Sequence, residues 1–222
     1  MFTAVIPARA GSKGAPGKNT GELAGKPLWR WSVDQARGAG AAKIVVSTDI
    51  QEIIHSVHED GLMVAERSSE LAGDDVPMGP VLMDLLADKA FAGDTIVLLQ
   101  PTSPLRRIED ISNALDVFAQ PDVELAMTVT EADAGVLKFG TIDGDHFKPL
   151  RDAKHCFSNR QSLPQVFRPN GAVYVFGRDW FLHNGGFETD NIGAVVMPTD
   201  VSQDIDTEED FAKAEAVLSG RV

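Results

Sequence analysis

Residues 2–19 read FTAVIPARAGSKGAPGKN, and this stretch indicates both the fold class and the position of a first candidate site. Its first part is an apolar run of the kind that forms a buried strand. Its second part combines three glycines with three cations, Arg9, Lys13 and Lys18. Glycine lets the main chain turn its N–H groups toward an anion, so the stretch predicts a strand that leads into a polyphosphate-binding loop.

The loop matches neither of two common nucleotide-binding patterns. No Gly-Lys-Ser or Gly-Lys-Thr closes it, and its glycines do not follow the spacing Gly-x-Gly-x-x-Gly. A solvated surface loop that holds no ligand is therefore an alternative interpretation. The other segments of the chain have to decide between the two.

Composition limits the classes of protein that need to be considered. A chain of 222 residues with 43% hydrophobic content can bury one substantial core, which predicts a single domain over residues 1–222. Its net charge of −13 argues against a nucleic-acid partner or an anionic membrane surface. With one cysteine, Cys156, and five scattered histidines, zinc chemistry is disfavoured and a metal with oxygen ligands is the remaining option. We expect Cys156 itself to be inert.

The segments that would direct a chain to a membrane are not visible in the sequence. The first strand is not preceded by a basic region and a long apolar run, and no apolar stretch approaches the roughly 20 residues of a membrane span. We therefore expect a cytoplasmic protein without a membrane partner.

Apolar strand-like runs alternate with helix-like segments in the first hundred residues. The expected strands are 2–7, 43–47, 62–65 and 94–99, and the expected helices are 27–36, 50–60 and 77–91. This alternation predicts an α/β fold with a doubly wound, mostly parallel sheet. Ligands of such sheets bind beyond the carboxyl ends of the strands. The glycine loop, residues 47–49 and residues 100–106 should therefore share one edge.

The regular alternation stops at about residues 131–170, where short strand-like pieces and turns precede a strand at 171–176. An inserted segment of this kind predicts a lid or a dimerisation arm, with a plain surface excursion as the alternative. The chain then continues with a strand at 194–198 and a helix at 207–219. Thr207 is the expected N-cap of that helix, with Asp210 three residues later.

Asp204 and Asp206 are the candidate metal ligands. Residues two apart in an extended segment project from the same face, with Cα atoms roughly 7 Å apart. Two carboxylates together with substrate phosphates form the usual site for Mg²⁺ (or Mn²⁺) in nucleotide chemistry. The alternative is that Asp206 and Glu208 only favour the start of the following helix, an explanation that fits Asp204 less well because it lies further from the helix.

A further set of polar residues predicts a site for an acceptor. Gln100 follows a strand directly, where its amide can bind hydroxyl groups, and Arg106 is suited to a carboxylate or a phosphate. Arg160 and Arg168 can grip a carboxylate with two hydrogen bonds, although single arginines are often surface ion-pair partners. Together with the cationic loop and the paired aspartates, these residues predict phosphoryl or nucleotidyl transfer.

Four segments, in order, resemble the acylneuraminate cytidylyltransferase family, the CMP-sialic acid synthetases: residues 6–19, 98–106, 168–175 and 204–207. Weaker similarity at 45–49 and 71–75 extends the resemblance over nearly the whole chain. It implies transfer of CMP from CTP to the anomeric hydroxyl of a nine-carbon sugar acid, a nonulosonic acid, with release of pyrophosphate. It also implies the nucleotidyltransferase fold, with a small dimerisation excursion and a homodimer as the assembly.

The resemblance also implies roles for individual residues. Arg9, Lys13 and Lys18 would bind the triphosphate. The residues that would surround the nucleotide are Ala8, Gly11, Ser12, Asn19 and Asp75. Asn19 would contact the cytosine or the ribose. The residues that would bind the sugar acid are Gln100, Thr102, Ser103, Arg106, Arg160 and Arg168. The last two would do so in this chain or from the partner subunit. Asp204 and Asp206 would bind Mg²⁺, and Asp206 would also polarise the attacking hydroxyl.

One position departs from the family pattern. Members of the family usually have a serine near the position of Met78, where it helps to recognise the base, and residues 76–79 contain none. We expect main-chain groups of residues 73–79 to take over that role. Residues 168–171 resemble the N-acetylneuraminate and legionaminate branch more than the pseudaminate branch.

Three other functions fit parts of the pattern. The first is cytidylyl transfer to another acceptor, such as Kdo or a sugar alcohol. The second is a metal-dependent sugar-nucleotide glycosyltransferase, since Asp-x-Asp also binds metal there. The third is a nucleotide-binding regulator without turnover, against which the complete set of cations and aspartates argues.

Overall fold

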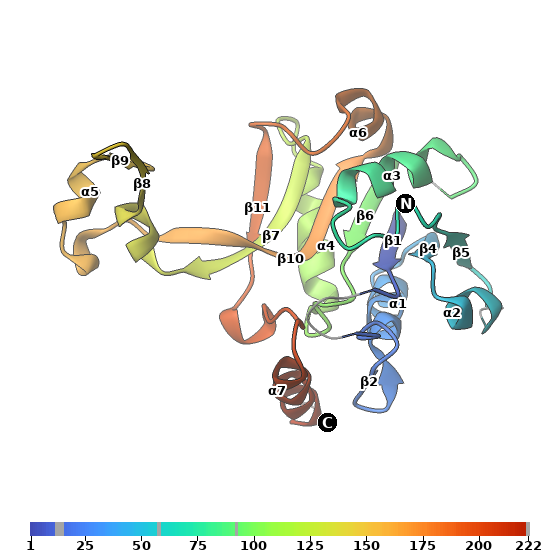
Figure 1. Cartoon of the computed structure of the whole chain (residues 1–222). Helices are drawn as coiled ribbons and strands as arrows, with labels where there is room; N and C mark the ends of the chain where they lie inside the picture. Colours follow the sequence, from blue (N-terminus) through green and yellow to red (C-terminus); the bar gives the residue numbers. More distant parts are fainter. Residues whose placement is uncertain (12–15, 57–58, 92, 221–222) are drawn as a thin grey trace.

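The computed structural model describes residues 1–11, 16–56, 59–91 and 93–220. Its centre is a seven-stranded sheet in the order β11-β7-β10-β6-β1-β4-β5 (Figure 1). The strands of this sheet are β1 Thr3–Ala8, β4 Lys43–Thr48, β5 Leu62–Glu66, β6 Thr95–Leu99, β7 Leu125–Ala132, β10 Val166–Gly177 and β11 Ile192–Val196. Two small hairpins are added by β2 Glu22–Leu23 with β3 Lys26–Pro27, and by β8 Gly140–Asp143 with β9 His146–Pro149.

Helices connect the strands. The α-helices are α1 Leu28–Gly38, α2 Gln51–Ser56, α3 Met78–Ala87, α4 Ile108–Phe118, α5 Lys154–Phe157, α6 Arg178–Asn184 and α7 Glu208–Ser219. Short 3₁₀ turns are η1 Ala134–Lys138, η2 Arg160–Ser162 and η3 Thr199–Val201. In the part of the chain described, no helix is both long enough and apolar enough to cross a membrane.

The sheet is mostly parallel, as the sequence predicts. β1 runs parallel to β4 and β6, β4 to β5, and β7 to β11, whereas β10 is antiparallel to both of its neighbours. Apolar layers cover both faces. Ala4 and Ile6 of β1 pack in the layer of α1 and α4, and Val5 packs in the layer of α3 and α6. Because both faces are buried, the central strands are continuously apolar rather than alternating.

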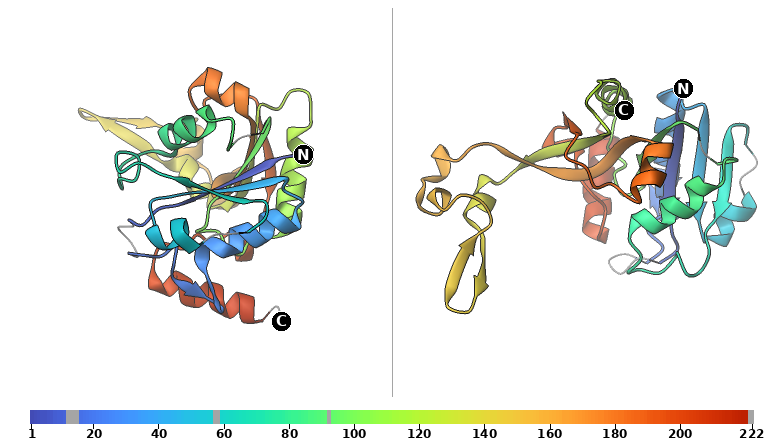
Figure 2. Two further views of the ribbon diagram at one scale, coloured as in Figure 1. Left: turned by 90° about the vertical axis from the view of Figure 1, so that its right-hand side faces the viewer. Right: turned by 90° about the horizontal axis from the view of Figure 1, so that it is seen from above.

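A long arm extends from one side of the sheet (Figures 1 and 2). It carries β8, β9 and α5, and its stalk is the outer half of the β7–β10 pair, in which Val166 lies opposite Ala132. β10 is therefore longer than the expected strand at 171–176. Its register shifts between Pro169 and Tyr174, where Gly171 has a φ of +77° that suits glycine.

The C-terminal segment returns to the glycine loop. After η3 an extended strap, residues 203–207, leads into α7, which begins with the capping box that the sequence predicts between Thr207 and Asp210. α7 packs beside the β2–β3 hairpin, where a Cβ on Gly21 would come 3.1 Å from the ring of Phe211. The strap is thus held beside the C-terminal end of the glycine loop, at Lys18.

Candidate functional site

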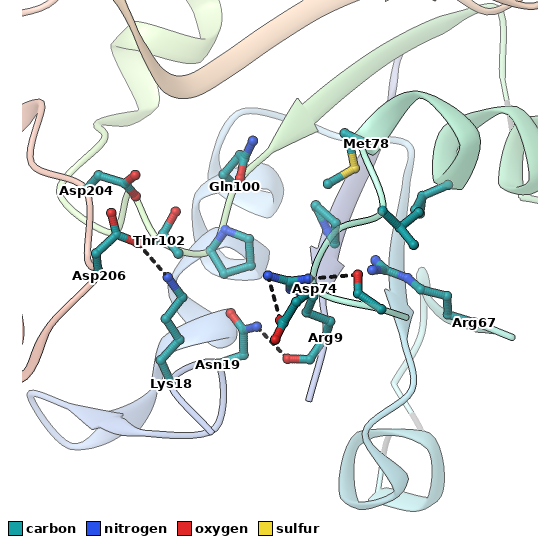
Figure 3. Close-up of a pocket in the computed structure, with 15 residues that line it drawn as sticks. Arg9, Lys18, Asn19, Arg67, Asp74, Met78, Gln100, Thr102, Asp204 and Asp206 are labelled. Atoms are coloured by element: carbon teal, nitrogen blue, oxygen red, sulfur yellow. Dashed lines mark hydrogen bonds and ion pairs between the residues drawn. The ribbon is translucent and has the colours of Figure 1, made fainter. Parts of the chain in front are cut away.

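A cleft of about 240 Å³ lies at the carboxyl ends of β1 and β6 (Figure 3). Its lining residues are Pro7, Arg9, Lys18, Asn19, Arg67, Gly73, Asp74, Val76, Met78, Val81, Gln100, Pro101, Thr102, Asp204 and Asp206. The glycine loop and the loop after β6 share this edge, as expected. Residues 47–49 do not line the cleft but support the start of the glycine loop, where Asp49 accepts a hydrogen bond from the main-chain N–H of Ala10 at 2.8 Å.

Lys18 joins the glycine loop to the strap. Its Nζ lies 2.9 Å from a carboxylate oxygen of Asp206 and 2.9 Å from the main-chain oxygen of Ile205. The Lys18 side chain is only 13% exposed, whereas that of Asp206 is 68% exposed. The ammonium is therefore held in a fixed place on the wall of the cleft, where an anion can reach it.

Arg9 is held on the opposite side of the same loop. Its guanidinium pairs with Asp74 at 3.1 Å and donates to the main-chain oxygen of Gly73 at 3.0 Å. Figure 3 shows Arg9, Asp74 and Arg67 toward one end of the cleft, and Asp204 and Asp206 at the other. Both cations thus have acidic partners, which a polyphosphate would replace as a stronger acceptor.

Asn19 has an unused hydrogen-bond acceptor. The residue is 4% exposed, and its Nδ2 donates to the main-chain oxygen of Arg9 at 2.8 Å. Its Oδ1 is buried and has no hydrogen-bond partner within the described part of the chain. A buried acceptor without a partner costs about 1–3 kcal/mol, so the geometry favours a ligand that donates a hydrogen bond here.

Asp204 and Asp206 both face the cleft, as their alternate spacing predicts. Between them Ile205 is fully buried, and its N–H donates to the main-chain oxygen of Thr102 at 2.8 Å. Asp204 is exposed at the cleft, but nearby protein removes part of the water around its carboxyl group, and this desolvation raises its pKa. The negative charge of Asp206 also raises the pKa of Asp204, whereas a hydrogen bond with the Thr102 side chain lowers it.

The two carboxylates fit a divalent cation that is also bound by phosphates. Their mutual repulsion would be relieved by a cation between them, and Mg²⁺ commonly takes one or two carboxylates and completes its shell with phosphate oxygens and water. No group of three or more His, Cys, Asp or Glu residues suited to a metal occurs in the described ranges. A site formed by protein ligands alone is thus not indicated there.

Arg106 does not lie in the cleft, which removes the basis for expecting it to bind a carboxylate or phosphate. It is 2% exposed, and its guanidinium donates to Gln35, to Ser32 and to the main-chain oxygens of Gln100 and Ala172. Burial lowers the pKa of Arg106 to about 9, so the side chain keeps its charge at neutral pH. Its role is to join α1, the loop after β6 and β10.

The remaining residues expected at the site differ in position. Ser103 is 1% exposed and Ala8 is fully buried, so neither side chain lines the cleft. Asp75 lies on the exposed turn beside the cleft, and Gly11 borders an adjoining hollow with Arg67 and Asp74. Ser12 and Lys13 lie outside the described residues.

Arg160 and Arg168 belong to the arm and its stalk and do not line the cleft of this chain. Arg160 is 70% exposed and forms an ion pair with Asp133. Arg168 is exposed on β10, opposite Thr130 of β7. The remaining expectation for both is that they contact the ligand of a partner subunit.

Sequence reasoning missed Arg67. This residue is 7% exposed, lines the cleft, and donates to the side chain and main chain of Ser47. Burial lowers its pKa, and the negative charge of Asp49 partly offsets that effect. Its position directly after β5 is the signal that could have found it, because that is where ligands of parallel sheets bind.

Comparisons with known proteins identify the family of the chain. A sequence profile described as cytidylyltransferase matches residues 3–181. The chain is 32% identical over 210 residues to N-acylneuraminate cytidylyltransferase of Streptococcus agalactiae, which covers 93% of this chain but 51% of that protein. The chain thus spans about half the length of that relative.

A relative of similar length and a solved structure extend the comparison. CMP-N,N'-diacetyllegionaminic acid synthase of Legionella pneumophila is 33% identical over 228 residues, covering 97% of this chain and 95% of that protein. The solved structure of CMP:2-keto-3-deoxy-manno-octonic acid synthetase complexed with CTP covers both chains completely, with a TM-score of 0.74 and 19% identity, and so shows the same fold. By its sequence profile and by these relatives, the chain belongs to the cytidylyltransferase family.

Proposed function

We propose that this protein transfers CMP from CTP to the anomeric hydroxyl of a nonulosonic acid and releases pyrophosphate. The observation that carries the proposal is a cleft that has Lys18 beside the paired carboxylates of Asp204 and Asp206 and Arg9 toward its other end. The names of the relatives at 32–33% identity, which refer to acylneuraminate and diacetyllegionaminic acid, support this class of acceptor.

In the proposed reaction the acceptor hydroxyl oxygen forms a bond to the α-phosphorus of CTP. The bond from that phosphorus to the bridging oxygen breaks, its electron pair leaves with pyrophosphate, and the proton of the attacking hydroxyl is released to the solvent. Lys18 and Arg9 would exchange their acidic partners for phosphate oxygens and stabilise the charge that develops there. Asp206 would polarise the attacking hydroxyl, and Gln100 would orient the sugar acid by its amide.

Asp204 and Asp206 are the residues that would hold Mg²⁺ or Mn²⁺. Such an ion supplies charge neutralisation for the phosphate oxygens. The chain contributes the two carboxylates. The main chain between them is anchored at Ile205, which hydrogen-bonds the main-chain oxygen of Thr102 and the ammonium of Lys18. The main chain between the two carboxylates is therefore held in place before a ligand binds.

The base would be bound between Asn19 and the turn of residues 73–79. Val76, Met78 and Val81 give this part of the cleft an apolar wall without a hydroxyl group. Recognition of cytosine then depends on main-chain groups, on Arg67 and on the unused oxygen of Asn19. We propose a preference for CTP over UTP and ATP, and for N-acetylneuraminate or legionaminate as acceptor.

The test is an acceptor panel. Purified protein with CTP and Mg²⁺ is incubated separately with N-acetylneuraminate, legionaminate, pseudaminate and Kdo, and pyrophosphate release is measured; UTP and ATP are then compared with CTP. Turnover with a nonulosonic acid and CTP is expected. Turnover with Kdo alone would assign a different acceptor, and equal rates with UTP would refute the proposed base recognition.

Replacing Asn19 should weaken nucleotide binding selectively. Asn19→Ala removes the buried oxygen that has no partner in the described structure, so we expect the Kd of CTP, measured by calorimetry, to rise roughly tenfold, equivalent to about 1.4 kcal/mol. Thr20→Ala is the matched control, since the Thr20 hydroxyl donates to the main-chain oxygen of Gly17 and Thr20 does not line the cleft. Equal CTP affinity in the two variants would contradict the assignment.

We further propose that the arm forms a homodimer. It exposes large apolar side chains that single proteins seldom leave in water, among them Phe139 (60% exposed), Ile142 (72%), Leu150 (62%) and Phe157 (90%). A second copy covering this surface would also bring the arm's Arg160 near another chain. In such a dimer, the arm of one subunit could contribute Arg160 to the acceptor site of the other.

Charged residues on the arm should separate the subunits. We expect the double variant Ile142→Asp/Phe157→Asp to have half the wild-type mass by light scattering, because the carboxylates could not be buried in an apolar interface. Val196→Asp, at a position 58% exposed on β11, is the control and should keep the wild-type mass. A wild-type protein that is already monomeric would refute the proposal.

A further inference from the structure

The strap that carries Asp204 and Asp206 is fixed at its far end by a residue outside the cleft. One carboxylate oxygen of Asp210, in the first turn of α7, accepts hydrogen bonds from the main-chain N–H of Asp206 at 3.2 Å and of Thr207 at 3.0 Å. It also accepts one from the hydroxyl of Thr207 at 2.8 Å. Asp210 therefore contacts the main chain of Asp206 directly.

These contacts go beyond an ordinary capping box. In a capping box the acidic side chain returns to the N–H of the N-cap residue, here Thr207. Asp210 reaches one residue further, to the N–H of the proposed metal ligand. The three donors lower the pKa of Asp210, which is consistent with a carboxylate that stays ionised.

The strap has only a few other attachments close to Asp206. Ile205 is held by two hydrogen bonds. Its N–H donates to the main-chain oxygen of Thr102, and its carbonyl oxygen accepts from the ammonium of Lys18. Asp206 follows this anchor; its side chain is mostly exposed, and its carboxylate pairs with Lys18 at 2.9 Å. On the C-terminal side, the direction of its main chain is set by Asp210. Loss of that contact would let Asp206 rotate away from Asp204 and the cleft.

We propose that Asp210 is a positioning residue that holds the carboxylate of Asp206 in place for a divalent cation and nucleotide phosphates. Asp210 does not line the cleft and touches neither ligand in this assignment. This inference rests on the proposed function, because it concerns the same carboxylate pair. It adds a residue through which α7 determines how well that pair binds metal.

The test compares CTP affinity with and without Mg²⁺, measured by calorimetry in the absence of any acceptor. We expect Mg²⁺ to strengthen CTP binding by the wild type, and Asp210→Ala to reduce that strengthening roughly 10- to 100-fold, the range for loss of a residue that orients a metal ligand. Asp210→Asn keeps an acceptor oxygen at the same place and should retain most of the strengthening.

Two control variants separate positioning from stabilisation of the helix. Thr207→Ala removes the N-cap hydroxyl but leaves the contact between Asp210 and the N–H of Asp206, so it should lower the melting temperature as Asp210→Ala does while keeping the Mg²⁺ effect. Glu209→Ala removes a neighbouring acid that pairs with Lys213 and should change neither quantity.

The possible outcomes distinguish the inference from the proposed function. If the Mg²⁺ effect in Asp210→Ala equals that in Thr207→Ala, the positioning role of Asp210 is refuted and the proposed function stands. If Mg²⁺ does not change CTP binding by the wild type, the metal assignment is refuted and the inference with it. Loss in Asp210→Ala with recovery in Asp210→Asn supports it.

Discussion

Asp206→Asn should reduce kcat by roughly 10²- to 10³-fold while the protein stays folded. The substitution keeps the shape of the side chain but removes the negative charge that faces the cleft beside Lys18. It therefore removes both the proposed metal ligand and the group that would polarise the acceptor hydroxyl. Pyrophosphate release at saturating CTP, Mg²⁺ and acceptor measures the effect, and the melting temperature checks the fold.

Glu208→Gln provides the matched control for this loss. Glu208 is an exposed acid two residues further along the chain, at the start of α7, and it does not line the cleft. The same acid-to-amide change there should leave kcat unaltered. If Asp206→Asn retained kcat within tenfold of the wild type, Asp206 would not have the proposed role, and the reaction would have to rely on Lys18, Arg9 and Asp204.

The aspartate pair shows what local sequence can predict. Alternation in an extended segment is a local property, so residues two apart share a face wherever the segment lies. The same holds for the capping box between Thr207 and Asp210, which involves only neighbouring residues. The apolar strands were predictable for a related reason, because burial on both faces leaves a continuous apolar run in the sequence.

Arg106 shows what local sequence cannot predict. Its partners Ser32, Gln35 and Ala172 lie 66–74 residues away along the chain. An arginine in a polar loop after a strand has the same local pattern whether it points into the cleft or into the core. Only the packing of α1 and β10 against the loop decides between these directions, and that packing depends on the whole chain.

The acceptor side of the site has the same limitation. Arg160 and Arg168 were expected near the sugar acid, and the structure places them on the arm and its stalk. Their function depends on the surface that the arm meets in an assembly, and a single chain does not contain that information. Asn19, in contrast, follows the glycine loop within a few residues, so its place at the cleft was predictable.

The buried guanidinium of Arg106 is stabilised by neutral acceptors. Nη2 donates to the Ser32 hydroxyl at 2.7 Å and to Gln35 Oε1 at 2.9 Å, and Nη1 donates to the main-chain oxygens of Gln100 and Ala172. These contacts hold the start of the loop that carries Gln100 and Thr102 into the cleft. Burying a charge in this way is tolerated only while the hydrogen bonds are complete.

Arg106→Met should therefore lower the free energy of unfolding by about 2–4 kcal/mol. The substitution leaves Gln35 Oε1 and the carbonyl oxygen of Ala172 buried without their donor, and each unsatisfied group costs about 1–3 kcal/mol. Denaturant titration measures the change, with Arg151→Met at an exposed position expected within about 0.5 kcal/mol of the wild type. A loss below 1 kcal/mol for Arg106→Met would mean that methionine packing compensates for the lost hydrogen bonds, and that Arg106 is not needed to hold the loop.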